Sequence, residues 1–497
     1  MIQYFKRIFH QTLIYGMGDM AVKMISFLLI PLYGRYLTPD AYGAYAIIYT
    51  FFTVLTLVLS LGFNSAIIKV YHDQNAHSKT GVISTALYTL LFSGLPITGL
   101  LVIFSPAISS LFFKTTDYTL YFRIIFVTAF FDLFRLTGLT YLRVLNKSAQ
   151  YAAINVITFF GLAILNILSV AVLKQGILGI LESQLLTTII TGLGLGLYIW
   201  TKTDRSFSRS HLKRLLDFGL PLVPSAVAGW SMNIMAIQFM HFYVDDYQVG
   251  LYHMCSKFGM IINMFLVRPF RTAWLPFAFS IQHDEKSKRV YSLTLTYFVL
   301  VASFVFLALS LFSYELVSFM ATQKYIDGII AIPFIAGAFV FYGMYYIVDI
   351  GILLNGKTKY YTYVLLATAI CQAAISFIMI PQFGMFGAAL VTFFSYVILF
   401  WGTYKMAQKL YPLAYEWIRI GKIFITSLTL LFIGLLIPHQ NLIISIIAKT
   451  CLLLIYPVVL WSLKFVYPQE LAALEKVVHK IQKGRHSYGK KKEGKKG

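Results

Sequence analysis

Four basic residues share one predicted helix in a largely apolar stretch: His253, Lys257, Arg268 and Arg271. At about 100° per residue along a helix, their side chains fall within about 60° of arc. No acidic residue stands three or four positions from any of them, so their cationic groups are available for the phosphate oxygens of a substrate. Arg268 and Arg271 lie near one end of the segment, where long basic side chains can instead reach lipid headgroups. Lys257 lies deeper and is the stronger candidate.

Two pairs of opposite charge fall inside other apolar segments. Asp19 and Lys23 are four positions apart, and Asp132 and Arg135 are three apart, spacings that allow an ion pair within one helix. Such pairs can serve helix packing alone. If the pairs line a cavity instead, Lys23 and Arg135 are candidate substrate contacts, and Asp19 and Asp132 are candidate coupling residues. Both interpretations stay open.

An aromatic and acidic face is predicted on a later helix. Tyr342, Tyr345 and Tyr346 precede Asp349 by one to two helical turns. Tyrosine rings can stack on sugar rings, so Tyr345 and Asp349 are candidate glycan contacts. Tyrosines are also common packing and interfacial residues in membrane proteins, which is the alternative interpretation.

The elements that carry these residues are membrane helices. The 497 residues are 59% hydrophobic and only 12% charged, against about 25% charged in a soluble domain, which excludes an ordinary soluble enzyme. Apolar stretches long enough to cross about 30 Å of hydrocarbon recur along the chain. They predict an all-α polytopic fold of about fourteen transmembrane helices, starting near Gln11, Tyr42, Gly81, Tyr118, Tyr151, Ile177, Leu212, Val249, Val290, Ile329, Tyr360, Met385, Ile418 and Leu442.

Several chemistries are disfavoured. Cys255, Cys371 and Cys451 lie in apolar segments at no metal-ligand or disulfide spacing. No nucleotide-binding motif occurs, and no outer loop is long enough for the catalytic site of a glycan polymerase. We therefore expect no enzyme activity, catalytic residue, metal or cofactor. The formal net charge of +22 is explained by membrane topology rather than nucleic-acid binding.

The basic residues set the predicted orientation. Most Lys and Arg residues fall in one set of alternating loops and in the tail, whereas the opposite loops carry only Arg35, Lys114, Lys174 and Lys324. Cytoplasmic loops are enriched in Lys and Arg, so both termini are predicted to be cytoplasmic. The lysine-rich tail is expected to bind anionic lipid headgroups.

An internal repeat divides the chain. Gly43 and Tyr45 align with Gly250 and Tyr252, and Gly176 and Gly179 with Gly384 and Gly387, at offsets of 207 and 208 positions. Because each unit holds six helices, the repeat is parallel, an arrangement in which transporters bind substrate between the halves. The predicted divisions are two six-helix lobes, an appended helix pair and a basic cytoplasmic tail: residues 1–205, 206–411, 412–465 and 466–497.

The chain resembles a known family in three stretches: Tyr15–Gly18, Ile30–Gly43 and Leu61–Ala66. With the helix count and the repeat, these are similar to polysaccharide transporters, the oligosaccharide flippases of the multidrug/oligosaccharidyl-lipid/polysaccharide exporter superfamily. The resemblance implies a MATE-like fold in the inner membrane of a bacterium or archaeon, with a cavity that opens alternately to each side. It does not identify the sugar.

We therefore expect a flippase that moves a polyprenyl-diphosphate-linked oligosaccharide from the cytoplasmic to the outer leaflet. Membrane lipids and other polysaccharide assembly proteins are the further expected partners. The alternative is a cation-coupled multidrug or other small-molecule exporter of the same fold. That function predicts a cavity rich in carboxylates, whereas the predicted face is basic.

Overall fold

The computed structural model describes residues 29–72, 78–145, 147–355, 357, 359–438 and 441–465, which form helices and no strand. The first half holds α2 (Ile30–Tyr36), α3 (Pro39–Leu59), α4 (Phe63–His72), α5 (Lys79–Ile103), α6 (Ser105–Phe113), α7 (Thr119–Val144), α8 (Ser148–Asn166), η1 (Ile167–Val172), α9 (Gly176–Lys202) and α10 (Arg209–Gly219). The second half holds α11 (Leu222–Tyr243), α12 (Asp246–Gly259), η2 (Asn263–Val267), α13 (Arg268–Ser280), α14 (Ser287–Leu311), α15 (Ser313–Met320), η3 (Gln323–Ile330), α16 (Ala331–Val348), α17 (Ile350–Leu354), α18 (Lys359–Leu410), α19 (Trp417–Leu435) and α20 (Leu442–Ser462).

The all-α membrane fold is confirmed. Among the described residues, nine helices are long and apolar enough to cross a membrane, so the chain is a multi-pass membrane protein. The predicted span start at Gln11 lies outside the described residues. Every later predicted start falls within a helix or directly before one. The total of fourteen stays a prediction.

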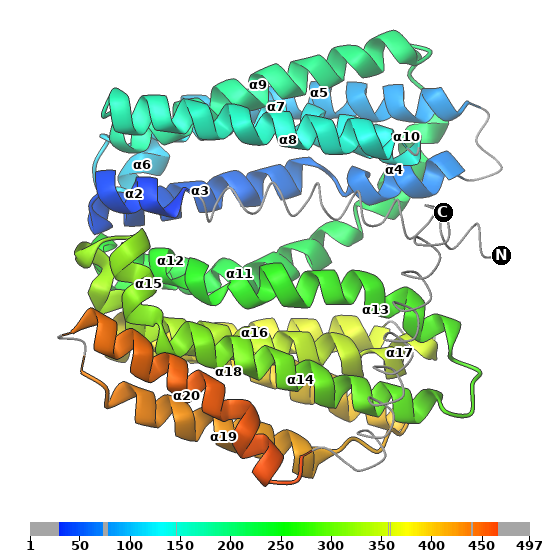
Figure 1. Ribbon diagram of the computed structural model, residues 1–497. Helices are drawn as coiled ribbons and strands as arrows, with labels where there is room; N and C mark the ends of the chain where they lie inside the picture. The colour runs from blue at the N-terminus through cyan, green and yellow to red at the C-terminus, as the bar shows by residue number, and fades with distance from the viewer. Residues whose placement is uncertain are drawn as a thin grey trace, which may run out of the picture.

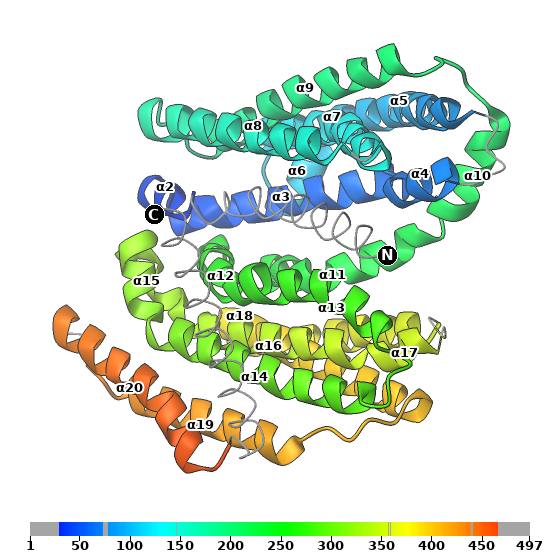
Figure 2. The ribbon, with the colours of Figure 1, turned by 45° about the vertical axis from the view of Figure 1, so that its right-hand side comes forward.

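The helices form two bundles, which both views show (Figures 1 and 2). Helices α2–α9 make the first bundle and α11–α18 the second, with α10 leading from one to the other. Helices α19 and α20 flank the second bundle on the side away from the first. The short helices α2, α6 and α15 lie at one end of the molecule, called here the α2 end, and α10 lies at the opposite, α10 end (Figure 1).

Matching elements recur in the two bundles. Helices α5 and α14 are both 25 residues long and begin 208 positions apart, at Lys79 and Ser287. The caps of α3 and α12 also match, because Thr38 accepts a hydrogen bond from the Ala41 amide and Asp245 one from the Gln248 amide. Short polar side chains satisfy the free amides of a helix start. The sequence repeat is therefore also a repeat of local structure.

A glycine breaks α18 into two helical halves. Gly384 has a φ of +56° and a ψ of −132° inside the 52-residue α18, and its repeat partner Gly176, the first residue of α9, has a φ of +60°. Residues that carry a side chain rarely adopt a positive φ, whereas glycine does so without steric cost. This break lies between the two span starts predicted at Tyr360 and Met385.

The bundles meet most closely where α3 crosses α12. A Cβ atom built on Gly43 would lie 2.0 Å from the carbonyl oxygen of Asp246, and one on Gly250 would lie 1.8 Å from that of Pro39. Each would also lie 3.0 Å from the backbone nitrogen of the other glycine. Because Gly43 and Gly250 are repeat partners, this reciprocal contact places a pseudo-twofold axis between them.

Polar contacts between the bundles cluster at the α2 end. The Tyr325 hydroxyl donates to the carbonyl of Leu37 at 3.3 Å, and the Thr322 hydroxyl donates to that of Gly34 at 3.1 Å. The Nε2 atom of His241 lies 2.7 Å from the carbonyl oxygen of Phe112, a hydrogen bond from α11 to α6. The two bundles are thus joined by close packing and by backbone-directed hydrogen bonds at this end.

A buried ion pair fixes α20 to the second bundle. The Lys449 ammonium lies 2.6 Å from Oε1 of Glu315 on α15, and the Ser445 hydroxyl donates to the same oxygen at 2.8 Å. Lys449 is only 1% exposed. A buried ammonium without its counterion is strongly destabilising, so this contact specifies how the terminal helix pair packs.

We expect Gly43→Ala to weaken the joint between the bundles. The added methyl group would overlap the Asp246 carbonyl, and overpacking of this kind costs about 1 to 3 kcal/mol. Spin labels at Arg35→Cys and Lys324→Cys, in a chain with Cys371 and Cys451 replaced by serine, would then report longer distances. Gly161→Ala is the matched control, since a Cβ atom there meets no described atom within 4 Å. Unchanged distances in Gly43→Ala would contradict this account of the joint.

Candidate functional site

Lys257 and His253 of α12 face a group of tyrosines across the junction between the bundles. The His253 ring stacks on Tyr42 of α3 with centroids 5.0 Å apart, and the Tyr45 ring lies 6.4 Å from it. The Lys257 ammonium lies 5.5 Å from the ring centre of Tyr42 and 6.0 Å from that of Tyr33 on α2. We call these five residues the interlobe cluster. It joins one cation and one imidazole of the second bundle to three phenol rings of the first.

Several polar groups of the interlobe cluster have no hydrogen-bond or ion-pair partner among the described residues. No described residue offers Lys257 an ion pair or a hydrogen bond, and the described atoms offer no hydrogen-bond partner to Nδ1 of His253 or to the Tyr42 hydroxyl. By contrast, the Tyr33 hydroxyl donates to Oδ1 of Asn166 at 2.9 Å. Aromatic faces partly offset the cost of holding a cation away from water. The cluster can therefore keep a positive charge with donor capacity left for an anion.

A row of aromatic rings continues from the interlobe cluster along α3. Ring centroids are 5.8 Å apart for Tyr42 and Tyr45, 5.6 Å for Tyr45 and Tyr49, and 5.4 Å for Tyr49 and Phe52. Sequence reasoning did not assign these residues to a site. Their spacing of three and four positions, which puts them on one helical face, was the available signal.

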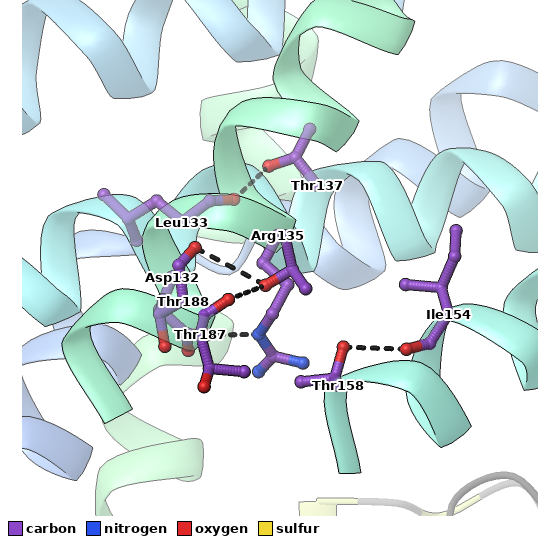
Figure 3. Close-up of polar contacts among 9 residues, drawn as sticks. Asp132, Leu133, Arg135, Thr137, Ile154, Thr158, Thr187 and Thr188 are labelled. Carbon is purple, nitrogen blue, oxygen red and sulfur yellow. Dashed lines mark hydrogen bonds and ion pairs between the residues drawn. The ribbon is translucent and has the colours of Figure 1, made fainter. Parts of the chain in front are cut away.

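The first bundle carries the predicted pair of Asp132 and Arg135. The Nε atom of Arg135 lies 2.5 Å from Oδ1 of Asp132, both on α7. Figure 3 shows the Arg135 side chain pointing toward Thr158 and Thr187 of the neighbouring helices. The side chain of Asp132 is 6% exposed and that of Arg135 21%, so the guanidinium keeps limited access to the surroundings.

The second bundle holds Arg271 against the predicted tyrosine face. The Arg271 guanidinium lies 3.9 Å from the ring centre of Tyr346 and donates to its hydroxyl at 2.8 Å. A short hydrogen bond joins the hydroxyls of Tyr342 and Tyr346. Tyr345 and Asp349 are both buried. Since protein covers the Tyr345 side chain here, its stacking on a sugar stays a prediction.

The predicted basic face of the eighth span is divided in the structure. Helix α12 ends at Gly259, and the π-helix η2 precedes α13, which begins at Arg268. A π-helical turn holds more residues than an α-helical one, so the rotation of an ideal helix does not carry across it. Lys257 consequently faces α2 and α3, whereas Arg271 faces α16.

Three further residues were predicted as site residues: Asp19, Lys23 and Arg268. Asp19 and Lys23 lie outside the described residues, so their pairing stays a prediction. Arg268 is exposed and is the first residue of α13. The predicted site residues that the structure describes therefore lie at three separate places, and among these three the interlobe cluster is the one that joins the two bundles.

Comparison with known proteins gives a family and a fold. The profile of the family described as "Polysaccharide biosynthesis protein" matches residues 32–330, more than half of the chain. The chain is 21% identical over 291 residues to "Lsg locus putative protein 1" of Haemophilus influenzae. The aligned region covers 56% of this chain and 68% of that protein.

Two solved structures share the architecture. The inward closed conformation of the lipid II flippase MurJ aligns with a TM-score of 0.75 and 17% identity over 90% of this chain and 99% of that one. An inward-facing multidrug resistance MATE transporter of the MOP superfamily aligns with a TM-score of 0.63 and 17% identity. This alignment covers 78% of this chain and 95% of that one. The chain thus belongs to the polysaccharide biosynthesis protein family and has the fold of the MOP superfamily of exporters.

Proposed function

We propose that this protein is a flippase that moves a polyprenyl-diphosphate-linked oligosaccharide from the cytoplasmic to the outer leaflet. The observation that carries the proposal is the position of Lys257, a cation at the junction of the bundles with no acidic partner among the described residues. A diphosphate is the part of such a substrate that an ammonium group recognises best. The family description and the likeness to the lipid II flippase fold support a lipid-linked saccharide as the cargo.

The proposed orientation follows from the basic residues. The few Lys and Arg residues of the predicted outer loops, such as Arg35 and Lys324, lie in α2 and η3, so the α2 end would face outward. The contact between Gly43 and Gly250 would then close the outer side and leave loading to the cytoplasmic side. We propose an inner-membrane location with both termini in the cytoplasm.

Transport would proceed by alternating access. The diphosphate would bind Lys257, assisted by the Tyr42 hydroxyl and by His253, while the glycan lies between the bundles and the lipid tail stays in the bilayer. The bundles would then rock about the substrate, as in other transporters built from repeats. The α3–α12 contact must part in this step, because it joins the two bundles. We assign no catalytic role to any residue, since the family and fold are those of transporters.

A cation-coupled exporter is the second candidate, and two observations favour it. Asp132 is a buried carboxylate in the first bundle, and the fold is shared with a multidrug transporter. Arg135 occupies one of its oxygens at 2.5 Å, however, so a cationic drug would have to displace a guanidinium. The basic interlobe cluster favours the anionic cargo.

We expect Lys257→Ala to lower flipping of a fluorescent polyprenyl-diphosphate oligosaccharide at least tenfold, because the variant loses the ammonium that binds phosphate. Proteoliposomes with an external reducing quencher would report the rate. Lys257→Arg should retain most of the activity. Lys114→Ala, an exposed lysine at the end of α6, is the matched control and should be neutral. An active Lys257→Ala variant would refute the proposed anion site, and transport of cationic dyes in place of the lipid would favour the exporter.

The Asp132 and Arg135 pair calls for a separate experiment that distinguishes packing from transport. Asp132→Asn leaves the guanidinium unpaired and should destabilise the protein by about 3 kcal/mol, as when one partner of a buried pair is removed. The double variant Asp132→Asn/Arg135→Gln should recover most of that stability in thermal unfolding. If the stable double variant flips substrate normally, the pair is purely structural. We expect instead that the flipping rate of the stable double variant falls at least fivefold, because the partly exposed Arg135 guanidinium contributes to transport. Both variants keep Lys257, so the loss would not come from the interlobe cluster.

A further inference from the structure

A shallow pocket, largely open to the surroundings and called here the cavity, lies where α18 ends and α19 begins, apart from the interlobe cluster. Its volume is about 580 Å³, within the range of sites that hold small ligands. It is lined by both polar and aromatic side chains, with Tyr404, Lys405, Gln408, Lys409, Tyr415 and Trp417 as its chemically distinctive members. No role in the proposed transport cycle uses this cavity.

The charge at the cavity mouth is positive and unbalanced. Lys405 and Lys409 are one helical turn apart on α18, both exposed, and no described residue forms an ion pair with either. The nearby carboxylate of Glu416 is already engaged, because its Oε2 lies 2.9 Å from Arg419 and accepts from the Thr296 hydroxyl at 2.8 Å. The two ammonium groups are therefore available to an anion.

The inner wall of the cavity is aromatic. The rings of Tyr404 and Trp417 meet edge to face at 5.1 Å, and Trp401 stacks on Trp417 at 5.4 Å. Tyr415 is 9% exposed, and its hydroxyl has no hydrogen-bond partner among the described atoms. An unpaired buried hydroxyl is costly unless a ligand or water reaches it. The cavity thus has an apolar wall, and the unpaired Tyr415 hydroxyl is buried within that wall.

The loop that lines the cavity is held in place by hydrogen bonds from α18 and from α14. Gln408 donates to the Leu413 carbonyl at 2.6 Å, and the Leu413 amide donates back to Gln408 Oε1 at 2.8 Å. The Ser292 hydroxyl of α14 donates to the Ala414 carbonyl at 2.7 Å. The cavity is consequently preformed, and a ligand would not have to order the loop.

We propose that this cavity binds the phosphate headgroup of an anionic phospholipid. The phosphate lies between the ammonium groups of Lys405 and Lys409 and accepts a hydrogen bond from the Tyr415 hydroxyl, which becomes accessible when the Tyr415 ring turns outward. The acyl chains leave along the exposed apolar face of α19, where Ile418 and Ile425 are 81% and 67% exposed. Basic pockets beside membrane helices are suited to such headgroups, and indole and phenol rings suit the membrane interface.

Titrations of the purified full-length protein in detergent test this site. The probe is dioctanoyl phosphatidylglycerol, and the readouts are native mass spectrometry of the bound lipid and tryptophan fluorescence. Lys405→Gln/Lys409→Gln should weaken binding about 30-fold, since each lysine near an anionic lipid contributes about fivefold. Tyr415→Phe removes only the hydroxyl and should weaken binding about threefold. Lys213→Gln/Lys286→Gln removes the same charge elsewhere on the surface and should have no effect.

Three outcomes would overturn the proposal. Equal weakening by the control double variant would mean that the lipid senses only overall charge. Equal binding of dioctanoyl phosphatidylcholine would mean that the lysines do not recognise net negative charge. Full competition by glycerol phosphate at the same concentration would identify a site for soluble anions rather than lipid. None of these readouts requires transport, so they test lipid binding independently of whether the protein is a flippase.

Discussion

The cost of placing a charged group away from water organises this protein more than any other interaction. Lys449 is buried against Glu315 at 2.6 Å, and Arg135 meets Asp132 at 2.5 Å. In each case a carboxylate neutralises the cation and fixes two elements or two turns of helix relative to each other. Lys257 differs, because the described residues that face its ammonium are aromatic rings and include no carboxylate. The same constraint therefore separates cations that a carboxylate already neutralises from a cation whose charge is held by aromatic rings.

The pseudo-twofold relation explains how two bundles of unlike sequence come to fit. Close approach of α3 and α12 requires a residue without a side chain on both helices, and Gly43 and Gly250 supply it from equivalent positions. Neither glycine has a positive φ, so the space between backbones, rather than conformational freedom, accounts for both. A contact on the axis between repeats can open without either bundle changing its internal packing. Rigid-body rocking is the motion that such a joint permits.

Local patterns in the sequence predicted the helices better than they predicted the site. Apolar length and the repeat anticipated the helical positions, including the break at Gly384, because each depends on a short stretch of chain. The basic face of the eighth span depended on an uninterrupted helix, and the π-helix η2 divides it. Tyr42 and Tyr45 were missed as site residues because their importance comes from contacts with His253, more than 200 positions away. Pairings of this kind arise only when the bundles come together.

The different surroundings of the basic residues also affect how readily each of them could bind an anionic cargo. A cation already paired with a carboxylate must lose that partner before it binds a phosphate, so the transfer gains little electrostatic energy. A cation held by rings loses only a weak quadrupole interaction, and the incoming anion brings the first full opposite charge. This difference supports the proposal that Lys257 receives an anionic cargo rather than a neutral or cationic one. Arg271, which already donates to the Tyr346 hydroxyl at 2.8 Å, is better suited to holding the second bundle together than to receiving the substrate first.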